Sequence, residues 1–372
     1  MVAEAEIKCP KSVPLMKINY HLRVTDDRDL QIDLPHPSSS PVFAEAVSCS
    51  DIVEDVHIKS TAIDFVPNIR SGSYADIGAR DSMDDEHVCI DDLSAHLRSV
   101  FKCSMPNGFY AVFDGHGGPH AAAFLKRNAM RLFFEDADWL KMQDIDSISL
   151  KDLENSHRKA FQLADLALAD EQSVSSSCGT TALTALVLGR HLLVANAGDC
   201  RAVLCRKGIA VPMSQDHRPS NLLELKRVEG MGGFVDDGYV NGYISVTRTL
   251  GDWDLKLPNG SSSPLIADPQ VEHVILTNDD EFLILGCDGI WDVMSSQYAV
   301  SLVRRGLRKH NDPHQSSREL VQEALRLNTS DNLTAIVICF SSPSCVPQQR
   351  ICKSCNLTEE ATSRLRSLLE GN

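Results

Sequence analysis

The sequence lacks a long apolar run. The stretch that comes nearest, 181–198, is interrupted by Arg190 and His191, so it stays below the roughly 18 apolar residues of a membrane span. The N-terminal segment MVAEAEIKCPKSVPLMKINY has no continuous apolar core of signal-peptide length. We therefore expect a soluble protein of the cytoplasm or the nucleus, with no membrane partner.

An excess of positive charge is missing as well. The chain has 36 Lys and Arg against 51 Asp and Glu, a formal net charge of -15 at pH 7. A surface of this sign repels phosphate backbones. DNA binding through residues 1–60 would need a basic cluster, and this segment has only scattered Lys and Arg among acidic residues. Nucleic acid is therefore not expected among the partners.

Cysteines in close pairs are scarce. Several cysteines lie inside apolar, strand-like runs, as reduced core residues of intracellular proteins do: Cys89, Cys205, Cys287 and Cys339. Cys352 and Cys355 form the one close pair, and no second pair or His cluster stands near them. We interpret this pair as an incidental surface feature and expect no zinc site.

The two ends of the chain differ from its middle. Residues 1–60 contain HPSSSP and short mixed segments, which predicts a flexible extension. Residues 343–372 predict a tail with one short amphipathic helix that begins near Thr358. The stretch 61–342 is the predicted domain, and no internal repeat is evident in it.

The domain combines strand and helix patterns. Residues 180–211 read as strand, turn, strand, turn, strand, with turn signals at Gly189-Arg190-His191 and Lys207-Gly208. Such tight connections predict antiparallel pairing, because parallel neighbours need a crossover of a dozen residues or more. Helical periodicity occurs at 119–134, 149–172, 220–230 and 296–327. The pattern predicts the α+β class, with layered sheets and helices outside them.

Acidic residues mark many strand ends and tight turns: Asp84, Asp85, Asp114, Asp199, Asp252, Asp288 and Asp331. A single such residue is more often a turn-former, because Asp-Gly and Asp-Asn are ordinary turn sequences. Two apolar strands that both end in Asp-Gly, at Asp114 and Asp288, are harder to explain in this way. If these strands lie side by side, the two carboxylates meet at one edge, where they need a cation to stay ionised.

The chemistry of this predicted site follows from its donor atoms. Oxygen ligands without His or Cys at ligand spacing select Mg²⁺ or Mn²⁺, and Gly115 lets its carbonyl approach an ion closely. Two such ions can share a water that yields hydroxide, a nucleophile for phosphorus. Arg80 has the planar fork for two phosphate oxygens, or is a surface residue of a polar turn. His116 is a general acid for the leaving alkoxide, or a loop histidine that satisfies its own hydrogen bonds.

The motifs resemble a known family. In chain order, GARDSMDDEH, FYAVFDGHGG, CGTTA, VANAGDCRAVL, QDHRP, YISVTRTLGD, GCDGIWDV and SDNLTAIVICF resemble the metal-dependent serine/threonine phosphatases of the protein phosphatase 2C family, most of all its plant members. The match runs from about residue 65 to 341. The resemblance implies a central antiparallel β-sandwich flanked by helices on both sides, a four-layer α-β-β-α fold. It further implies two Mg²⁺ or Mn²⁺ ions in a cleft at one sandwich edge.

The resemblance also implies roles for single residues. Asp114 matches the carboxylate that bridges both ions, and Gly115 matches the carbonyl ligand of the first ion. Asp288 and Asp331 match ligands of the second ion. Substrates are expected to be proteins that carry phosphoserine or phosphothreonine, in plant signalling, and the enzyme is expected to be a monomer.

The remaining site residues match less direct roles. Arg80 matches the phosphate-binding arginine, and His116 matches the proposed general acid. Residues that act through water or help to hold a weaker third ion are matched by Asp85, Asp199 and Asp292. Most family members have Glu at the position of Asp84, and a side chain shorter by one methylene can still reach an ion through a bridging water.

An absence in the sequence bears on partners. Plant phosphatases that bind abscisic-acid receptors carry a tryptophan in the loop that here reads GGFVDDGYVNGYISVTRTLGD, and this loop has none. Abscisic-acid receptors are therefore not expected as partners. The alternative to an active enzyme is a scaffold that has lost its site, but Asp114, Asp288 and Asp331 are all retained.

Overall fold

The computed structural model describes residues 65–97, 101, 103–135, 137, 140, 149–256 and 263–341, all within the unit Ala62–Asn372. No helix in this part of the chain combines the length and the apolar character that a membrane span needs. The predicted extension 1–60, the helix expected near Thr358 and the pair Cys352 and Cys355 lie outside the described residues. The domain boundaries therefore stay predictions.

Two five-stranded antiparallel sheets form the centre of the described domain. Sheet I has the order β1 (Arg70–Asp76), β15 (Leu333–Cys339), β14 (Asp280–Gly286), β8 (Arg201–Arg206) and β9 (Ile209–Pro212). Sheet II has the order β13 (Gln270–Ile275), β7 (His191–Ala197), β6 (Ala182–Leu188), β3 (Asn107–Phe113) and β2 (Glu86–Ile90). Short strands at one end form two smaller sheets: β4 (Gly115–His116), β5 (Gly179–Thr180) and β12 (Leu250–Gly251) in one, and β10 (Val235–Asp236) and β11 (Tyr239–Val240) in the other.

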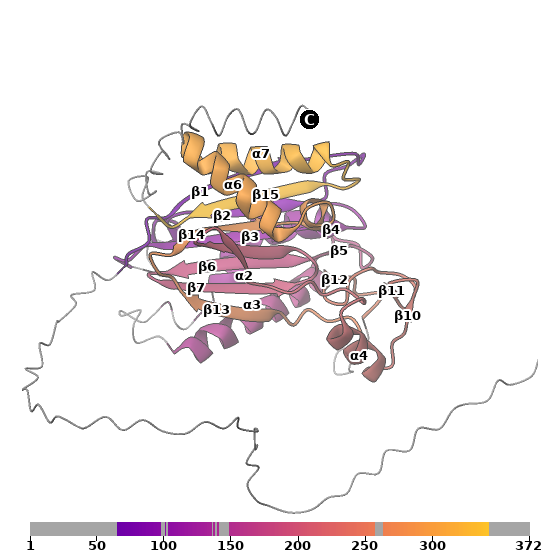
Figure 1. Ribbon diagram of the computed structural model, residues 1–372. Coiled ribbons are helices and arrows are strands. Elements are labelled where there is room, and N and C mark those ends of the chain that lie inside the picture. The colour runs from indigo at the N-terminus through magenta and orange to yellow at the C-terminus, as the bar shows by residue number, and fades with distance from the viewer. Residues whose placement is uncertain are drawn as a thin grey trace, which may run out of the picture. The chain divides into compact units, whose positions relative to one another are not determined.

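Helices cover both outer faces of the sandwich (Figure 1). On sheet II pack α2 (His120–Phe134) and α3 (Leu150–Asp170), and on sheet I pack α6 (Ser296–His310) and α7 (Pro313–Arg326). Three further helices are short: α1 (Leu93–Leu97), α4 (Leu222–Gly230) and α5 (Asp288–Trp291). The predicted α+β class and four-layer arrangement are confirmed.

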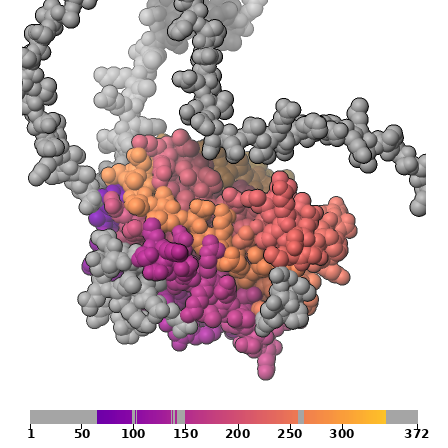
Figure 2. Space-filling model, turned by 90° about the horizontal axis from the view of Figure 1, so that it is seen from below, coloured from indigo at the N-terminus to yellow at the C-terminus, as the bar shows by residue number. Residues whose placement is uncertain are grey.

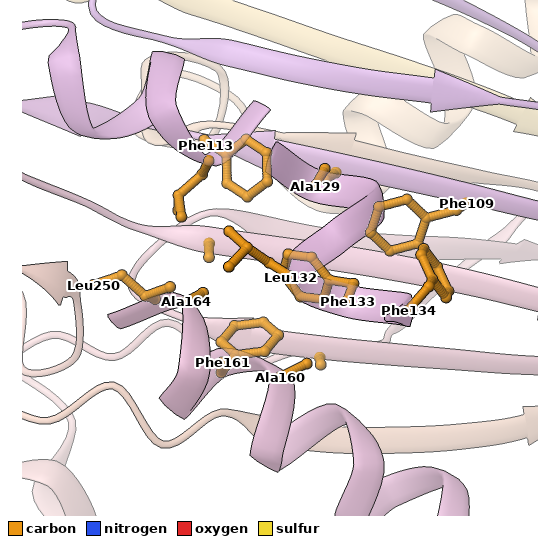
Figure 3. Close-up of a cluster of buried hydrophobic side chains, with 14 of the residues drawn as sticks. Phe109, Phe113, Ala129, Leu132, Phe133, Phe134, Ala160, Phe161, Ala164 and Leu250 are labelled. Carbon is orange, nitrogen blue, oxygen red and sulfur yellow. The ribbon is translucent and has the colours of Figure 1, made fainter. Parts of the chain in front are cut away.

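The last five residues of β3, 109–113, are apolar or aromatic because both faces of the strand are buried. Successive side chains of a strand point to opposite faces. Phe109 and Phe113 therefore pack against α2 and α3, while Tyr110 and Val112 pack between the two sheets. Figure 3 shows the outer cluster, where the rings of Phe109 and Phe134 meet edge to face with centroids 5.0 Å apart. No charged side chain occurs in this buried strand, and the first one follows at its end, at Asp114.

The strands that precede Asp114 and Asp288 do not meet the condition of lying side by side, because β3 belongs to sheet II and β14 to sheet I. One expectation about the strands was wrong. The stretch between the two turns of 180–211 is not one strand. It divides into β7 and β8, which lie in different sheets, and Gly198 (φ +124°) stands in the crossing between them. A tight connection can thus change sheets instead of making a hairpin.

The periodic stretch 296–327 forms two helices. Asn311 ends α6 in a left-handed conformation (φ 53°), and the Asp312 side chain accepts hydrogen bonds from the N–H groups of His314 and Gln315 at the start of α7. Pro313 occupies the first turn of α7, where a missing N–H costs nothing. The stop and start signals were present in the sequence, and apolar periodicity alone passes over them.

Candidate active site

A cavity of about 580 Å³ lies at the end of the sandwich where β3 and β14 finish. Eight of the predicted site residues line it: Arg80, Asp84, Asp114, Gly115, His116, Asp199, Asp288 and Asp331. Asp85 lies behind these lining residues and is 4% exposed. Asp292 has a half-exposed side chain and reaches the group through Arg218. The carboxylates thus converge from both sheets, across the sandwich rather than along one sheet.

The short sheet of β4, β5 and β12 positions the residues around Asp114. The Asp114 carbonyl accepts hydrogen bonds from Thr181 N–H (2.8 Å) and the Thr180 hydroxyl (3.0 Å), so the CGTTA motif fixes the end of β3. Gly115 pairs with Thr180 in this sheet. A Cβ on Gly115 would lie 2.4 Å from the Asp84 carbonyl oxygen, so close packing of this main chain explains the glycine independently of any ion.

Asp114 is common to two groups of potential metal ligands. Ligand atoms of Asp85, Asp114 and Cys287 lie within 4.8 Å of one another, and so do those of Asp114, Asp199 and Asp288. Burial raises the pKa of the Cys287 thiol well above its usual range, so this group stays protonated and is a poor ligand. The remaining donors are carboxylate oxygens, with Asp114 between the two groups.

The carboxylates are held in an unfavourable state without a cation. Burial raises the pKa of Asp114 well above its usual range, and the negative charges of Asp85 and Asp288 raise it further. Burial likewise raises the pKa of Asp288, with the charge of Asp199 as the next cause. Two buried oxygens, Asp84 Oδ1 and Asp85 Oδ2, have no hydrogen-bond partner. Raised pKa values and unpartnered oxygens fit a site for hard divalent ions.

Arg218 is a site residue that the sequence analysis missed. Its guanidinium forms ion pairs with Asp199 (Nε–Oδ2 2.8 Å), Asp288 (Nη2–Oδ2 2.9 Å) and Asp292 (Nη1–Oδ1 2.9 Å). It therefore supplies one positive charge to three predicted metal-site carboxylates. The available signal was its place in QDHRP, a motif used only as part of the resemblance.

The neighbours of Arg218 in this motif hold the loop before β8. Asp216 pairs with both Nε and Nη2 of Arg201 (2.9 and 2.6 Å). The His217 Nδ1 accepts the N–H of Gly198 at 3.2 Å, and burial lowers the pKa of His217 to about 3, so the ring stays neutral. This acceptor fixes the turn that presents Asp199.

Arg80 and its loop are held by the SDN motif. Arg80 Nη2 lies 2.7 Å from Asp331 Oδ2, and its side chain is 57% exposed at the mouth of the cavity. Asn332 donates to the carbonyls of Ile77 (2.8 Å) and Ser82 (2.9 Å), and its oxygen accepts the N–H of Asp84 (2.8 Å). Asn332 was also missed, and its role depends on three partners about 250 positions away in sequence.

His116 is paired with a carboxylate outside the predicted metal ligands. Its Nε2 lies 2.9 and 2.8 Å from the two oxygens of Asp252, which is 2% exposed. Gly179 lies between His116 and Gly251 in the short sheet, and a Cβ there would lie 2.0 Å from Asp252 Oδ2. The glycine of CGTTA therefore makes room for the His116–Asp252 contact. His116 thus has a hydrogen-bond partner outside its own loop, and its role as a general acid stays a prediction.

Comparison with known proteins identifies the family. The family model described as "Protein phosphatase 2C" matches residues 70–333. "Probable protein phosphatase 2C 13" of Arabidopsis thaliana is 56% identical over 382 residues, which cover 100% of this chain and 98% of that protein. "Probable protein phosphatase 2C 47" of Oryza sativa subsp. japonica is 53% identical over 391 residues, which cover 100% and 99%.

Solved structures support the fold. "Crystal structure of serine-threonine phosphatase 2C from Toxoplasma gondii" superposes with a TM-score of 0.62 at 21% identity, over 74% of this chain and 98% of that one. "Structure of a C.elegans sex determining protein" has a TM-score of 0.63 at 25% identity, over 74% of this chain and 66% of that one. The predicted family is thereby confirmed: the chain belongs to the protein phosphatase 2C family of serine/threonine protein phosphatases, with plant proteins among its relatives of high identity.

Proposed function

We propose that the chain hydrolyses phosphoserine and phosphothreonine in proteins with two Mg²⁺ or Mn²⁺ ions held around Asp114. The observation that carries the proposal is the place of the half-buried Asp114 in both groups of potential ligands, among carboxylates whose negative charges repel one another. Asp288 and Asp331 would complete one ion site, and Asp85 and the Gly115 carbonyl would support the other. When bound, the two ions would lower the pKa of a shared water and so supply the hydroxide nucleophile.

The chain's own side chains would perform the remaining steps. Arg80, exposed at the cavity mouth, would bind two oxygens of the phosphate and hold it at the site. His116, oriented by Asp252, would donate its proton to the serine or threonine oxygen that leaves. Asp84, Asp199 and Asp292 are proposed to act through water or to hold a weaker third ion, for which Arg218 competes as an internal cation.

The other proposals concern the setting of the enzyme. We propose a monomer of the cytoplasm or nucleus that acts in plant signalling, on the grounds of the sequence features and of the plant relatives. Abscisic-acid receptors are not proposed as partners, because the described loop 233–243 offers Phe234, Tyr239 and Tyr243 as surface aromatics but no tryptophan. Dose-dependent inhibition by a hormone-loaded receptor would contradict this.

The test of the function is metal removal. Protein stripped with EDTA should not hydrolyse a phosphothreonine peptide, and added Mn²⁺ or Mg²⁺ should restore turnover, because oxygen-only sites bind these ions weakly enough to be emptied. A thermal melt of the stripped protein serves as the control that it remains folded. Full turnover by folded protein in chelator would overturn the two-ion proposal.

A further inference from the structure

A buried ion pair lies beside the active site and outside the carboxylate cluster. Asp165 on α3 and Lys256, which follows β12, have side chains only 10% and 5% exposed, and Lys256 Nζ lies 2.7 Å from Asp165 Oδ1. Removal of both charges from water is costly, and such a pair is weak evidence for stability by itself. Its hydrogen bonds show what else it does.

The pair ties the segment 249–256 to α3 at several points. Asp165 Oδ1 also accepts the N–H of Gly251 (2.8 Å), and Lys256 Nζ also donates to the Thr249 carbonyl (3.0 Å). The indole N–H of Trp253 donates to the main-chain carbonyl of Asp165 (3.0 Å). Figure 3 shows Leu250 of this segment beside Ala164 of α3. Both ends of the segment are thus held by the same two side chains.

Between these ends lies Asp252, the partner of His116. Asp252 has a left-handed backbone (φ 52°), a conformation that costs a residue with a Cβ roughly 1 kcal/mol and that surrounding contacts must maintain. Its N–H donates to the Cys178 carbonyl (3.0 Å), and its carboxylate accepts from the Thr249 hydroxyl. Any movement of 249–256 would therefore move the carboxylate that orients His116.

We propose that the Asp165–Lys256 ion pair positions Asp252, and through it the imidazole of His116, for proton donation to the leaving oxygen. The inference rests on the proposed function, in which His116 is the general acid. Asp165 and Lys256 line no part of the cavity and contact none of the predicted metal ligands, so both are positioning residues. Ion binding and phosphate binding do not depend on them.

The consequence is a dependence on the leaving group. A serine alkoxide is a strong base and needs a proton as it leaves, whereas p-nitrophenolate is a weak base and leaves without one. Asp165→Asn keeps an oxygen for the Gly251 N–H but removes the charge that pairs with Lys256. We expect its kcat for a phosphoserine peptide to fall by roughly ten-fold, less than the 10²–10⁴-fold that a general acid supplies, because His116 itself is retained. Its kcat for p-nitrophenyl phosphate should stay near that of the parent.

Three variants of the full chain complete the experiment, all assayed with both substrates at saturating Mn²⁺. His116→Ala should show the same selective loss and a larger one. Asp280→Asn is the matched control, because Asp280 at the start of β14 is also a buried carboxylate in an ion pair, here with Arg206 (Nε, 2.8 Å). This variant should show no selectivity between the substrates. The double variant Asp165→Asn/Lys256→Met buries no unpaired charge, so it should fold and carry the test if a single variant does not.

The outcomes separate this inference from the proposed function. Selective loss in His116→Ala but equal turnover of both substrates in the folded Asp165 variants would overturn the positioning role alone. Equal loss of both substrates in the Asp165 variants would also overturn it, because it would indicate a general structural role. A parent enzyme that hydrolyses neither substrate with Mn²⁺ would instead overturn the proposed function.

Discussion

Glu224 and the carboxylates around Asp114 are both buried acids, but they differ in how their charge is balanced. Glu224 on α4 is 4% exposed and accepts hydrogen bonds from Arg248 (2.6 Å), Arg227 (2.9 Å) and the Thr247 hydroxyl (2.7 Å). Burial raises the pKa of Glu224, but these hydrogen bonds outweigh it and hold the pKa well below its usual range. The single negative charge of Glu224 is thus paired with two arginine side chains.

The cluster around Asp114 has the opposite balance. Burial raises the pKa values of Asp85, Asp114, Asp199 and Asp288, and among the described residues Arg218 is the arginine paired with Asp199 and Asp288. The contrast shows how a structural acid differs from a functional one. The charge of Glu224 is balanced by its arginine partners, and these contacts fix α4 beside the cavity. The cluster around Asp114 retains negative charge that only a bound cation or protons can balance.

The largest expected effect is that of Asp114→Asn. The amide keeps the shape and the acceptor oxygen but loses the charge that would bridge two ions, so kcat should fall by several orders of magnitude. The metal-free variant should be at least as stable as the parent, because one repulsive carboxylate is gone. Phosphopeptide turnover at saturating Mn²⁺ and a thermal melt measure both. A folded variant with parental turnover would show that Asp114 only forms a turn.

Glu224→Gln should have the opposite effect to Asp114→Asn: it should lower stability and leave the metal site intact. It leaves two arginines with a neutral acceptor in a buried position, and we expect a loss of roughly 3 kcal/mol of unfolding free energy. The loss should be the same with and without Mn²⁺, since Glu224 is not a ligand. Urea unfolding under both conditions tests this, and a loss that Mn²⁺ cancels would make Glu224 part of the metal site.

Arg218→Gln should have a smaller effect, and it should lower the stability of the metal-free protein but raise its affinity for Mn²⁺. Loss of the internal cation leaves the carboxylates with more repulsion, so the metal-free protein should be destabilised, while Mn²⁺ should bind about five-fold more tightly, roughly 1 kcal/mol. Arg304→Gln is the matched control, because Arg304 is as exposed as Arg218 (28% against 29%) and pairs with Glu281 away from the site. Calorimetric titration with Mn²⁺ compares them, and unchanged affinity in Arg218→Gln would refute competition.

The smallest expected effect is the pH dependence of stability in metal-free protein. Burial first, and neighbouring charges second, raise the pKa of Asp288 to about 7 and that of Asp85 to about 6. A raised folded-state pKa means that the folded protein binds more protons than the unfolded chain, so this stability is lost as pH rises through about 6 to 7. The fall in Tm between about pH 5 and about pH 8 should be larger for the parent than for Asp114→Asn. Equal slopes would indicate that the cluster does not titrate in this range.

The sequence by itself determined the mixture of strands and helices and the chemical type of the site. The apolar run of β3, the caps around Asn311 and Pro313, and the Asp-Gly ends of two strands are local patterns that need no knowledge of the fold. Local patterns carry this information because backbone conformation and strand or helix periodicity depend on near neighbours. The ordered motifs added the family, and with it the α-β-β-α layers.

The tertiary structure alone decided which side chains share a site. The sequence could place Asp114 and Asp288 at strand ends, but not assign those strands to opposite sheets of a sandwich. The QDHRP motif marked Arg218, but nothing in the sequence showed that Arg218 joins three carboxylates, or that Asp165 and Lys256 meet beside the partner of His116. The physical reason is that these contacts join residues far apart in the chain, and their energies depend on burial and on the sum of nearby charges. Neither quantity exists until the two sheets and their helices have packed together.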